Sequence, residues 1–212
     1  MEKAGVFIAI EGREGVGKST LKKALQEMLP VTIPSRQFVF TREPGGTPYA
    51  DKIYDLFKQG MSETNARALF GLVLASRFDH IEKVVKPELA TGKVVVSDRY
   101  EASTFAYQVF AQQAPELEPM YFCHRELIPH PDMTLILEAP TDVILARLAE
   151  RKGQEVSAFD ASDRAFHDRL AQGYERYARD FVPDNHCFVN GNQAPSKVQM
   201  DALDILFDCI PV

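Results

Sequence analysis

Residues 12–19 have the types and spacing of a loop that binds the phosphates of a nucleotide. Their sequence, GREGVGKS, fits the pattern G-x-x-x-x-G-K-[ST]. In such a loop, glycines let backbone N–H groups approach phosphate oxygens, and the following helix adds positive potential at its N-terminus. Lys18 would place its charge on the β- and γ-phosphates, and Ser19 would offer a hydroxyl to Mg²⁺. The sequence therefore predicts a nucleotide-binding protein.

One carboxylate and two arginines follow two other apolar runs. Asp98 comes directly after the run VVVS, where a carboxylate can complete the ligand shell of Mg²⁺. A helix N-cap or an ion pair with Arg99 is the alternative role for this carboxylate. The planar guanidinium of Arg99 suits a phosphate. Arg42 lies in TREPGGT, where proline and glycine fix the backbone and leave room for an anion; alone, this segment would be a turn with an exposed arginine.

The elements that must position these residues are short buried strands. Apolar runs at residues 6–10, 38–40, 94–96, 134–137 and 187–189 are typical of strands, and helical patterns separate most of them. This alternation predicts an α/β fold with a five-stranded parallel sheet and helices on both faces. Ligands of such sheets bind beyond the carboxyl ends of the strands. The three motifs should therefore meet at one edge of the sheet.

Composition limits the class of protein. With 212 residues, 45% hydrophobic and 25% charged, the chain is expected to form a single globular domain over residues 1–212. A net charge of −6 argues against a nucleic-acid partner. No apolar run approaches the roughly 18 residues of a membrane span, and the first strand starts too early for a signal peptide. We therefore expect a cytoplasmic protein with no membrane segment, whose three cysteines stay reduced.

Two insertions interrupt the alternation of strands and helices. Residues 41–92 are too many for a simple crossover and carry long helical periodicity, which suggests a region that binds the acceptor. Residues 147–164 are polar and rich in arginine, as a mobile lid would be. A solvated connection between two helices is the alternative for this second insertion.

The three motifs together resemble the thymidylate kinase family of nucleoside monophosphate kinases, and TREPGGT is specific to its bacterial type. Further stretches that are similar to the family include LASR at residues 74–77, STFAYQ at 103–108 and PDMTLILE at 131–138. The resemblance implies a P-loop NTPase fold with three α/β/α layers, a region at 41–92 that binds the monophosphate, and a lid at 147–164. It also implies a homodimer that uses ATP, dTMP and Mg²⁺ to make dTDP for dTTP biosynthesis.

The resemblance assigns roles residue by residue. Its ATP-binding set is Gly12, Arg13, Glu14, Gly15, Val16, Gly17, Lys18, Ser19 and Thr20. Its dTMP-binding set is Glu14, Arg42, Phe70, Val73, Arg77, Arg99, Ser103, Thr104, Tyr107 and Gln108. Lys18, Asp98, Arg99 and Arg151 are the implied catalytic residues, with Ser19 and Asp98 at the metal. Within the acceptor set, the arginines 42 and 99 bind the 5′-phosphate, Glu14 approaches the sugar 3′-hydroxyl, and Arg77 donates to a thymine carbonyl.

The sequence departs from the family in three places. Val73 stands where the family has a phenylalanine that stacks on thymine, and Phe70 lies on the same helix face as a partial substitute. Ser157 and Ala158 replace the usual Asp-Arg of the lid, so Arg151 is the predicted lid cation. Arg13 adds an unusual charge to the loop and is expected at the surface.

Other activities compete with this interpretation. The loss of the stacking residue would suit a kinase for dUMP or a 5-modified pyrimidine monophosphate. A deoxynucleoside kinase is less consistent with two arginines placed for a phosphate already on the acceptor. From another class, a switch GTPase or nucleotide-binding regulator lacks support, because the sequence contains no N-K-x-D motif for reading guanine.

Overall fold

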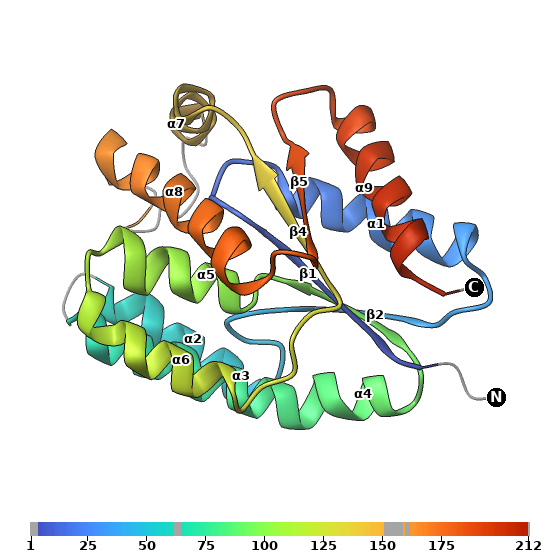
Figure 1. Cartoon of the computed structure of the whole chain (residues 1–212), viewed down its shortest axis with the longest axis horizontal. Helices are drawn as coiled ribbons and strands as arrows, with labels where there is room; N and C mark the ends of the chain where they lie inside the picture. Colours follow the sequence, from blue (N-terminus) through green and yellow to red (C-terminus); the bar gives the residue numbers. More distant parts are fainter. Residues whose placement is uncertain (1–3, 62–64, 151–158, 160–161, 212) are drawn as a thin grey trace.

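A five-stranded parallel sheet forms the centre of the protein (Figure 1). The computed structural model describes residues 4–61, 65–150, 159 and 162–211. The strands, in the spatial order β2-β3-β1-β4-β5, are β1 Val6–Gly12, β2 Phe38–Arg42, β3 Val94–Asp98, β4 Met133–Glu138 and β5 His186–Asn190. Each contains one of the apolar runs, so the predicted strands and the predicted α/β class are confirmed.

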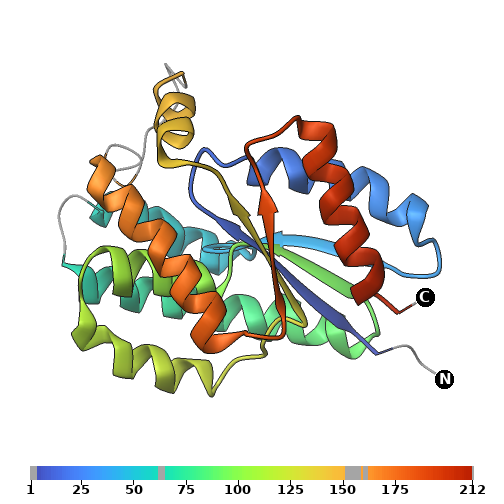
Figure 2. The ribbon, with the colours of Figure 1, turned by 45° about the horizontal axis from the view of Figure 1, so that its top comes forward.

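Helices cover both faces of the sheet (Figure 2). The α-helices are α1 Lys18–Thr32, α2 Pro48–Gly60, α3 Ala66–His80, α4 Lys86–Ala90, α5 Glu101–Thr104, α6 Glu118–Arg125, α7 Thr141–Glu150, α8 Arg164–Phe181 and α9 Pro195–Cys209. Two π-helical segments, η1 Ile81–Val85 and η2 Phe105–Ala111, continue α3 and α5, and a short 3₁₀ turn, η3 Pro115–Leu117, precedes α6. None of the helices in the described ranges is long and apolar enough to cross a membrane.

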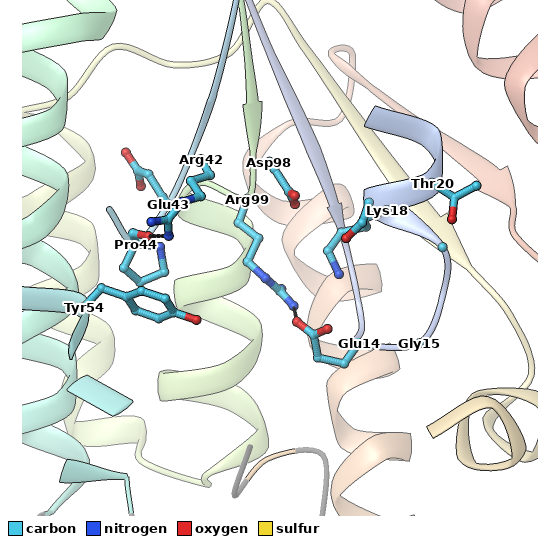
Figure 3. A pocket seen from close by; sticks show the side chains of 12 residues that line it. Glu14, Gly15, Lys18, Thr20, Arg42, Glu43, Pro44, Tyr54, Asp98 and Arg99 are labelled. Carbon is cyan, nitrogen blue, oxygen red and sulfur yellow. Dashed lines mark hydrogen bonds and ion pairs between the residues drawn. The ribbon is translucent and has the colours of Figure 1, made fainter. Parts of the chain in front are cut away.

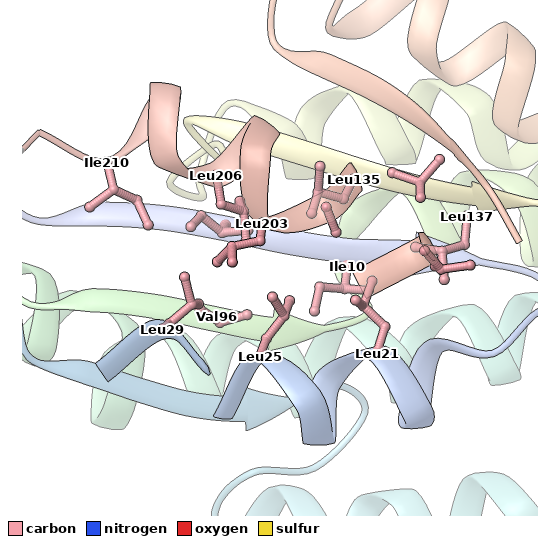
Figure 4. Close-up of a cluster of buried hydrophobic side chains, with 14 of the residues drawn as sticks. Ile10, Leu21, Leu25, Leu29, Val96, Leu135, Leu137, Leu203, Leu206 and Ile210 are labelled. Atoms are coloured by element: carbon pink, nitrogen blue, oxygen red, sulfur yellow. The ribbon is translucent and has the colours of Figure 1, made fainter. Parts of the chain in front are cut away.

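The main core lies between the sheet and the pair α1 and α9 (Figure 4). Leu21, Leu25 and Leu29 recur every fourth residue, so one stripe of α1 faces the sheet. Alternate residues of β1, such as Ile8 and Ile10, point to the same side. Burying each such side chain stabilises the fold by about 1.5–3 kcal/mol, and the resulting rigidity fixes the start of α1 relative to the end of β1.

The opposite face of the sheet carries the elements that surround the predicted acceptor. There α8 packs closely on η2, because Gly173 has no side chain: a Cβ at this position would lie 3.0 Å from the Cα of Ala106. This close approach holds η2, which carries Tyr107, against the rest of the fold.

The two insertions differ in how far the structure describes them. The described residues of 41–92 form α2, α3, η1 and α4: α2 follows the carboxyl end of β2, and α4 leads into the start of β3 (Figure 1). The predicted lid at 147–164 begins in the last turn of α7 and ends where α8 starts. Residues 151–158 and 160–161, with the predicted cation Arg151, lie outside the described residues. The functions of both segments stay predictions.

Candidate active site

The predicted phosphate loop joins β1 to α1 through backbone that only glycine adopts readily. Gly12 has φ 133° and Gly17 has φ 108°. A Cβ on Gly12 would also lie 2.5 Å from the carbonyl oxygen of Leu137, so the loop cannot accept a side chain there. Gly17 caps the N-terminus of α1 without a side-chain hydrogen bond, which leaves the first N–H groups of the helix for an anion.

Lys18 is the cation of this loop, and it is buried. Its side-chain Nζ donates a 2.9 Å hydrogen bond to the carbonyl oxygen of Arg13, and the residue is 6% exposed. Burial, and then repulsion from the nearby Arg99 guanidinium, lower the pKa of the Lys18 ammonium to about 8. A bound polyphosphate would offset both effects.

The carboxyl ends of β1, β2 and β3 meet at one pocket, as predicted from the motifs (Figure 3). Lys18 enters it from the phosphate loop, Arg42 from the end of β2, and Asp98 and Arg99 from the end of β3. The register explains the meeting, because Asp98 is paired with Ile10 of β1 on one side and with Arg42 of β2 on the other. Three cations therefore face one space, which the acidic residues Glu14, Glu43 and Asp98 also line, and the cations suit bound phosphates.

Arg99 is held in a strained conformation that aims its side chain into the pocket. Its φ of 69° is rare for a residue with a Cβ. Its backbone N–H donates to the carbonyl oxygen of Ile10 at 2.9 Å, and its guanidinium pairs with the carboxylate of Glu14 (Figure 3). The guanidinium carbon lies 5.1 Å from the ring centre of Tyr107. These contacts fix the orientation of Arg99 without any ligand.

The buried carboxylate of Glu11 helps to position Arg99 through Ser103. Glu11 accepts hydrogen bonds from the backbone N–H of Tyr100 at 2.8 Å and from the hydroxyl of Ser103 at 2.5 Å. Ser103 Oγ in turn accepts from Arg99 at 2.9 Å and lies 2.9 Å from the hydroxyl of Tyr174. Burial raises the pKa of Glu11. Ser103, predicted beside the base, is thus engaged in positioning Arg99, and its contact with a base stays a prediction.

The side chain of Arg42, at the end of β2, is more exposed than that of Arg99. Its guanidinium donates to Asp51 Oδ1 at 2.7 Å and to the carbonyl oxygen of Pro44 at 2.9 Å, and its side chain is 44% exposed. Tyr54 of α2 lies beneath it, with the guanidinium carbon 5.4 Å from the ring centre. Tyr54 lines the pocket but was missed in the sequence, because an aromatic residue at helical spacing predicts only a core position.

Arg77 is buried and contacts Glu43, the residue that follows β2. Its Nε donates to Glu43 Oε2 at 2.6 Å and its Nη2 donates to Thr104 Oγ1 at 2.9 Å. Its Nη1 is buried and has no hydrogen-bond partner among the residues that the structure describes. An unpaired buried donor is costly, and the predicted hydrogen bond from Arg77 to an oxygen of the base stays a prediction.

The base-stacking substitute predicted at Phe70 has no accessible face. Phe70 is fully buried and packs in the cluster that contains η2 and α8, whereas Val73 packs in a separate cluster with Phe57. Tyr54 and Phe159 are the partly buried aromatic residues that pack against this second cluster. The aromatic surface around Val73 therefore comes from residues that the sequence pattern did not single out, and a role for Phe70 stays a prediction without support from its burial.

Tyr107 and Gln108 both lie in η2 and are nearly buried. The hydroxyl of Tyr107 accepts a 3.3 Å hydrogen bond from the backbone N–H of Glu14, so it connects η2 to the phosphate loop. The ring of Phe159 meets Tyr107 edge-on at 5.4 Å. The structure thus brings Tyr107 into contact with Glu14 and Arg99, which line the pocket, and the predicted contacts of Tyr107 and Gln108 with a nucleotide stay predictions.

The expectation that Arg13 lies at the surface is wrong. Arg13 is 4% exposed, and its guanidinium donates to Thr141 Oγ1 at 3.0 Å, to the carbonyl oxygen of His167 at 3.3 Å and to that of Ala139. Its side chain therefore anchors the loop to the end of β4 and to α8. The predicted contact of Arg13 with ATP stays a prediction.

Arg147 forms a second anchor of the phosphate loop. Its guanidinium donates to the carbonyl oxygens of Gly191 at 3.0 Å and Gly15 at 3.4 Å. It therefore links α7 to the loop and to the segment after β5. No pattern in the sequence distinguished this tethering role from that of a lid cation.

The oxygen atoms of Ser19 and Asp98 suit a hard divalent cation. Both residues line the same pocket as Lys18, and no larger group of possible metal ligands occurs among the described residues. Mg²⁺ in nucleotide sites takes one or two protein oxygens and completes its shell with phosphate and water. This donor set fits that pattern.

Comparisons with known proteins agree on one family. The family model for thymidylate kinase matches residues 10–202. A thymidylate kinase of Gluconobacter oxydans is 37% identical over 215 residues, covering 100% of this chain and 99% of that protein. One of Caulobacter vibrioides is 40% identical over 177 residues, covering 82% and 83%. A crystal structure of thymidylate kinase from Ehrlichia chaffeensis superposes with a TM-score of 0.76 at 24% identity, covering 96% and 99%.

Proposed function

The chain belongs to the thymidylate kinase family, and on this premise we propose that the pocket at the ends of β1, β2 and β3 transfers the γ-phosphoryl group of ATP to dTMP. One observation carries the proposal: Lys18 from the phosphate loop after β1, Arg42 from the end of β2 and Arg99 from the end of β3 face one space with Asp98. Nothing among the described residues favours dUMP as the acceptor.

The chain's own residues act by position and charge. Lys18 and the N–H groups of the loop hold the β- and γ-phosphates of ATP, while Arg42 and Arg99 hold the phosphate of dTMP. The acceptor oxygen is already ionised at neutral pH, so no general base is needed. The barrier comes from bringing two anions into line, and the cations reduce their repulsion.

Glu14 and Tyr107 set the place of the sugar. Glu14 binds Arg99 and its own backbone N–H bonds to Tyr107, so carboxylate and ring border the same space. This supports a contact of Glu14 with the 3′-hydroxyl, with Tyr107 occupying the volume that a 2′-hydroxyl would need.

Magnesium is the proposed cofactor. Ser19 and Asp98 would hold the ion, which would supply positive charge that offsets part of the phosphate charge. The third proposed catalytic cation, Arg151, lies outside the described residues.

Thymine recognition rests on the unpaired donor of Arg77. Its Nη1 is buried and unpaired among the described residues, while Glu43 holds its Nε and Thr104 holds its Nη2. A pyrimidine carbonyl would satisfy this donor, whereas the amino group at the same position of cytosine would not.

We also propose a homodimer. Large apolar side chains of α3 and α6 are exposed, namely Phe78 at 37%, Met120 at 51% and Phe122 at 48%. The two helices meet where Phe78 contacts His124 at 5.6 Å between ring centres. An apolar patch of this kind suits a protein partner. Sedimentation equilibrium should give twice the chain mass, and Phe122→Glu should give the single-chain mass.

The acceptor is tested by ADP release with ATP and Mg²⁺ against dTMP, dUMP, dCMP, dGMP, dAMP and UMP. We expect kcat/KM for dTMP to exceed that for every other monophosphate by at least about tenfold. Equal rates with dUMP would reject dTMP as the specific acceptor. Absence of transfer to any monophosphate, in protein that binds ATP, would reject the kinase.

A further inference from the structure

We propose that Tyr54 binds the acceptor nucleotide in two ways: its ring holds the guanidinium of Arg42, and its hydroxyl donates a hydrogen bond to the acceptor's phosphate. This inference rests on the proposed function, because it needs a phosphomonoester bound at Arg42. It adds a binding residue that none of the three sequence motifs contains.

The position of Tyr54 carries the first step. It belongs to α2, whose Phe57 is buried and packs with Val73, and its own ring stacks on that of Phe57 at 6.3 Å between centres with planes 25° apart. This packing fixes the ring plane. Tyr54 also lines the pocket together with Lys18 and Arg42. One rigid ring therefore extends from the apolar cluster to the phosphate-binding space.

The ring acts on Arg42. The guanidinium carbon of Arg42 lies 5.4 Å from the ring centre, within the range of a cation–π contact. Arg42 is otherwise held by Asp51 and a backbone carbonyl, and its side chain is 44% exposed. When a phosphate takes these donors, the ring still faces the guanidinium. The ring therefore limits the side-chain entropy that Arg42 loses on binding.

The hydroxyl acts on the ligand. Figure 3 shows the hydroxyl of Tyr54 directed into the middle of the pocket, toward Arg99 and away from the helix that carries it. Within the described part of the chain, this hydroxyl makes no hydrogen bond. A phosphate held between Arg42 and Arg99 would lie in front of it. A phenol is a donor, and a phosphate oxygen is a charged acceptor, so the bond would be of the stronger kind.

Two substitutions distinguish the contribution of the Tyr54 ring to dTMP binding from that of its hydroxyl. Tyr54→Phe keeps the ring and removes the hydroxyl, whereas Tyr54→Leu removes both but keeps bulk against the apolar cluster. Tyr49 provides the matched control: it lies on the same helix with Lys83 5.6 Å from its ring centre, but it is 59% exposed and does not line the pocket. Calorimetry with the full chain measures the dissociation constants of dTMP, thymidine and ATP.

We expect Tyr54→Phe to weaken dTMP binding about tenfold and to leave thymidine and ATP within about twofold of wild type. Tyr54→Leu should lose a further factor of about three for dTMP. In an Arg42→Met background this second loss should vanish, because the ring acts through Arg42. The phenylalanine and leucine variants of Tyr49 should bind all three ligands as wild type does.

Other results would overturn the inference. Unchanged dTMP binding by Tyr54→Phe would reject the hydrogen bond from the hydroxyl to the phosphate. An equal loss of affinity for thymidine and dTMP would show that the hydroxyl contacts the sugar. A leucine effect that persists without Arg42 would reject the role of the ring. Wild-type protein that binds ATP but not dTMP would overturn the proposed function together with this inference. Wild-type protein that binds dTMP, with unchanged binding by the Tyr54 variants, would overturn this inference alone.

Discussion

Replacing Lys18 by methionine should stabilise the folded protein while abolishing phosphoryl transfer. The side chain is 6% exposed, and burial followed by repulsion from Arg99 lower the pKa of its ammonium from 10.5 to about 8. Methionine keeps much of the alkyl packing and removes the buried charge. Because Lys18 is the cation of the phosphate loop, activity should fall by at least about 100-fold.

The size of the gain follows from proton linkage. The folded state binds the Lys18 proton more weakly than the unfolded state does, so the charge destabilises the fold below pH 8, and this cost disappears as pH rises from 8 to 10.5. The shift corresponds to about 3 kcal/mol at pH 7. The loop carbonyl that accepts from Lys18 loses a hydrogen bond in the variant, which costs about 1 kcal/mol. The expected net gain is about 2 kcal/mol at pH 7, and it should fall by about 2 kcal/mol at pH 9.5.

Urea unfolding of both proteins at pH 7 and 9.5 measures this difference, and ADP release measures activity. Lys23→Met is the control, because Lys23 lies on the same helix but is exposed. Its free energy of unfolding should change by less than about 0.5 kcal/mol at either pH. A methionine variant at position 18 that is less stable than wild type at pH 7, or a gain that is the same at both pH values, would refute the reasoning.

Three further substitutions test other parts of the site. Asp98→Asn should raise the Mg²⁺ concentration for half-maximal ADP release about tenfold with the dissociation constant of dTMP unchanged; an unaltered Mg²⁺ curve would contradict the metal role. Arg77→Met should lower the free energy of unfolding by about 3–5 kcal/mol in urea, because Glu43 stays buried beside it without its guanidinium partner; a loss below about 1 kcal/mol would show that the pair is not needed. Gly173→Ala should cost about 1–3 kcal/mol in a thermal melt, since its Cβ meets Ala106; an unchanged melt would mean that α8 and η2 separate without cost.

The sequence predicted those parts of the fold that local pattern controls. The central strands β1, β3 and β4 are buried and the edge strands β2 and β5 are partly buried, yet each contains a short apolar run that made it recognisable. The position of Asp98 after its run led directly to the pocket. The convergence of three motifs followed from one topological rule: the carboxyl ends of parallel strands share an edge.

What the sequence could not predict depends on contacts between distant residues. Arg13 is buried because its guanidinium meets carbonyl oxygens and a hydroxyl that lie 126 to 154 residues away in the chain. Phe70 and Val73 share a helix face by spacing, yet they pack into different clusters. Tyr54 lines the pocket because of how α2 packs beside the end of β2, and a lone tyrosine at helical spacing carries no signal of that geometry.

The side-chain cations of the pocket are each held by oxygen atoms of the chain itself, so a phosphate that binds to them exchanges hydrogen-bond partners at these side chains. Arg99 is paired with Glu14 and is 16% exposed, whereas Arg42 is paired with Asp51 at 44% and 47% exposure. An exposed pair contributes about 0–1 kcal/mol, so breaking the pair at Arg42 costs little. Arg99 has the less exposed pair and a strained backbone already fixed in place. A phosphate therefore reorganises the site mainly at Arg42, while Lys18 and Arg99 are already oriented when it arrives.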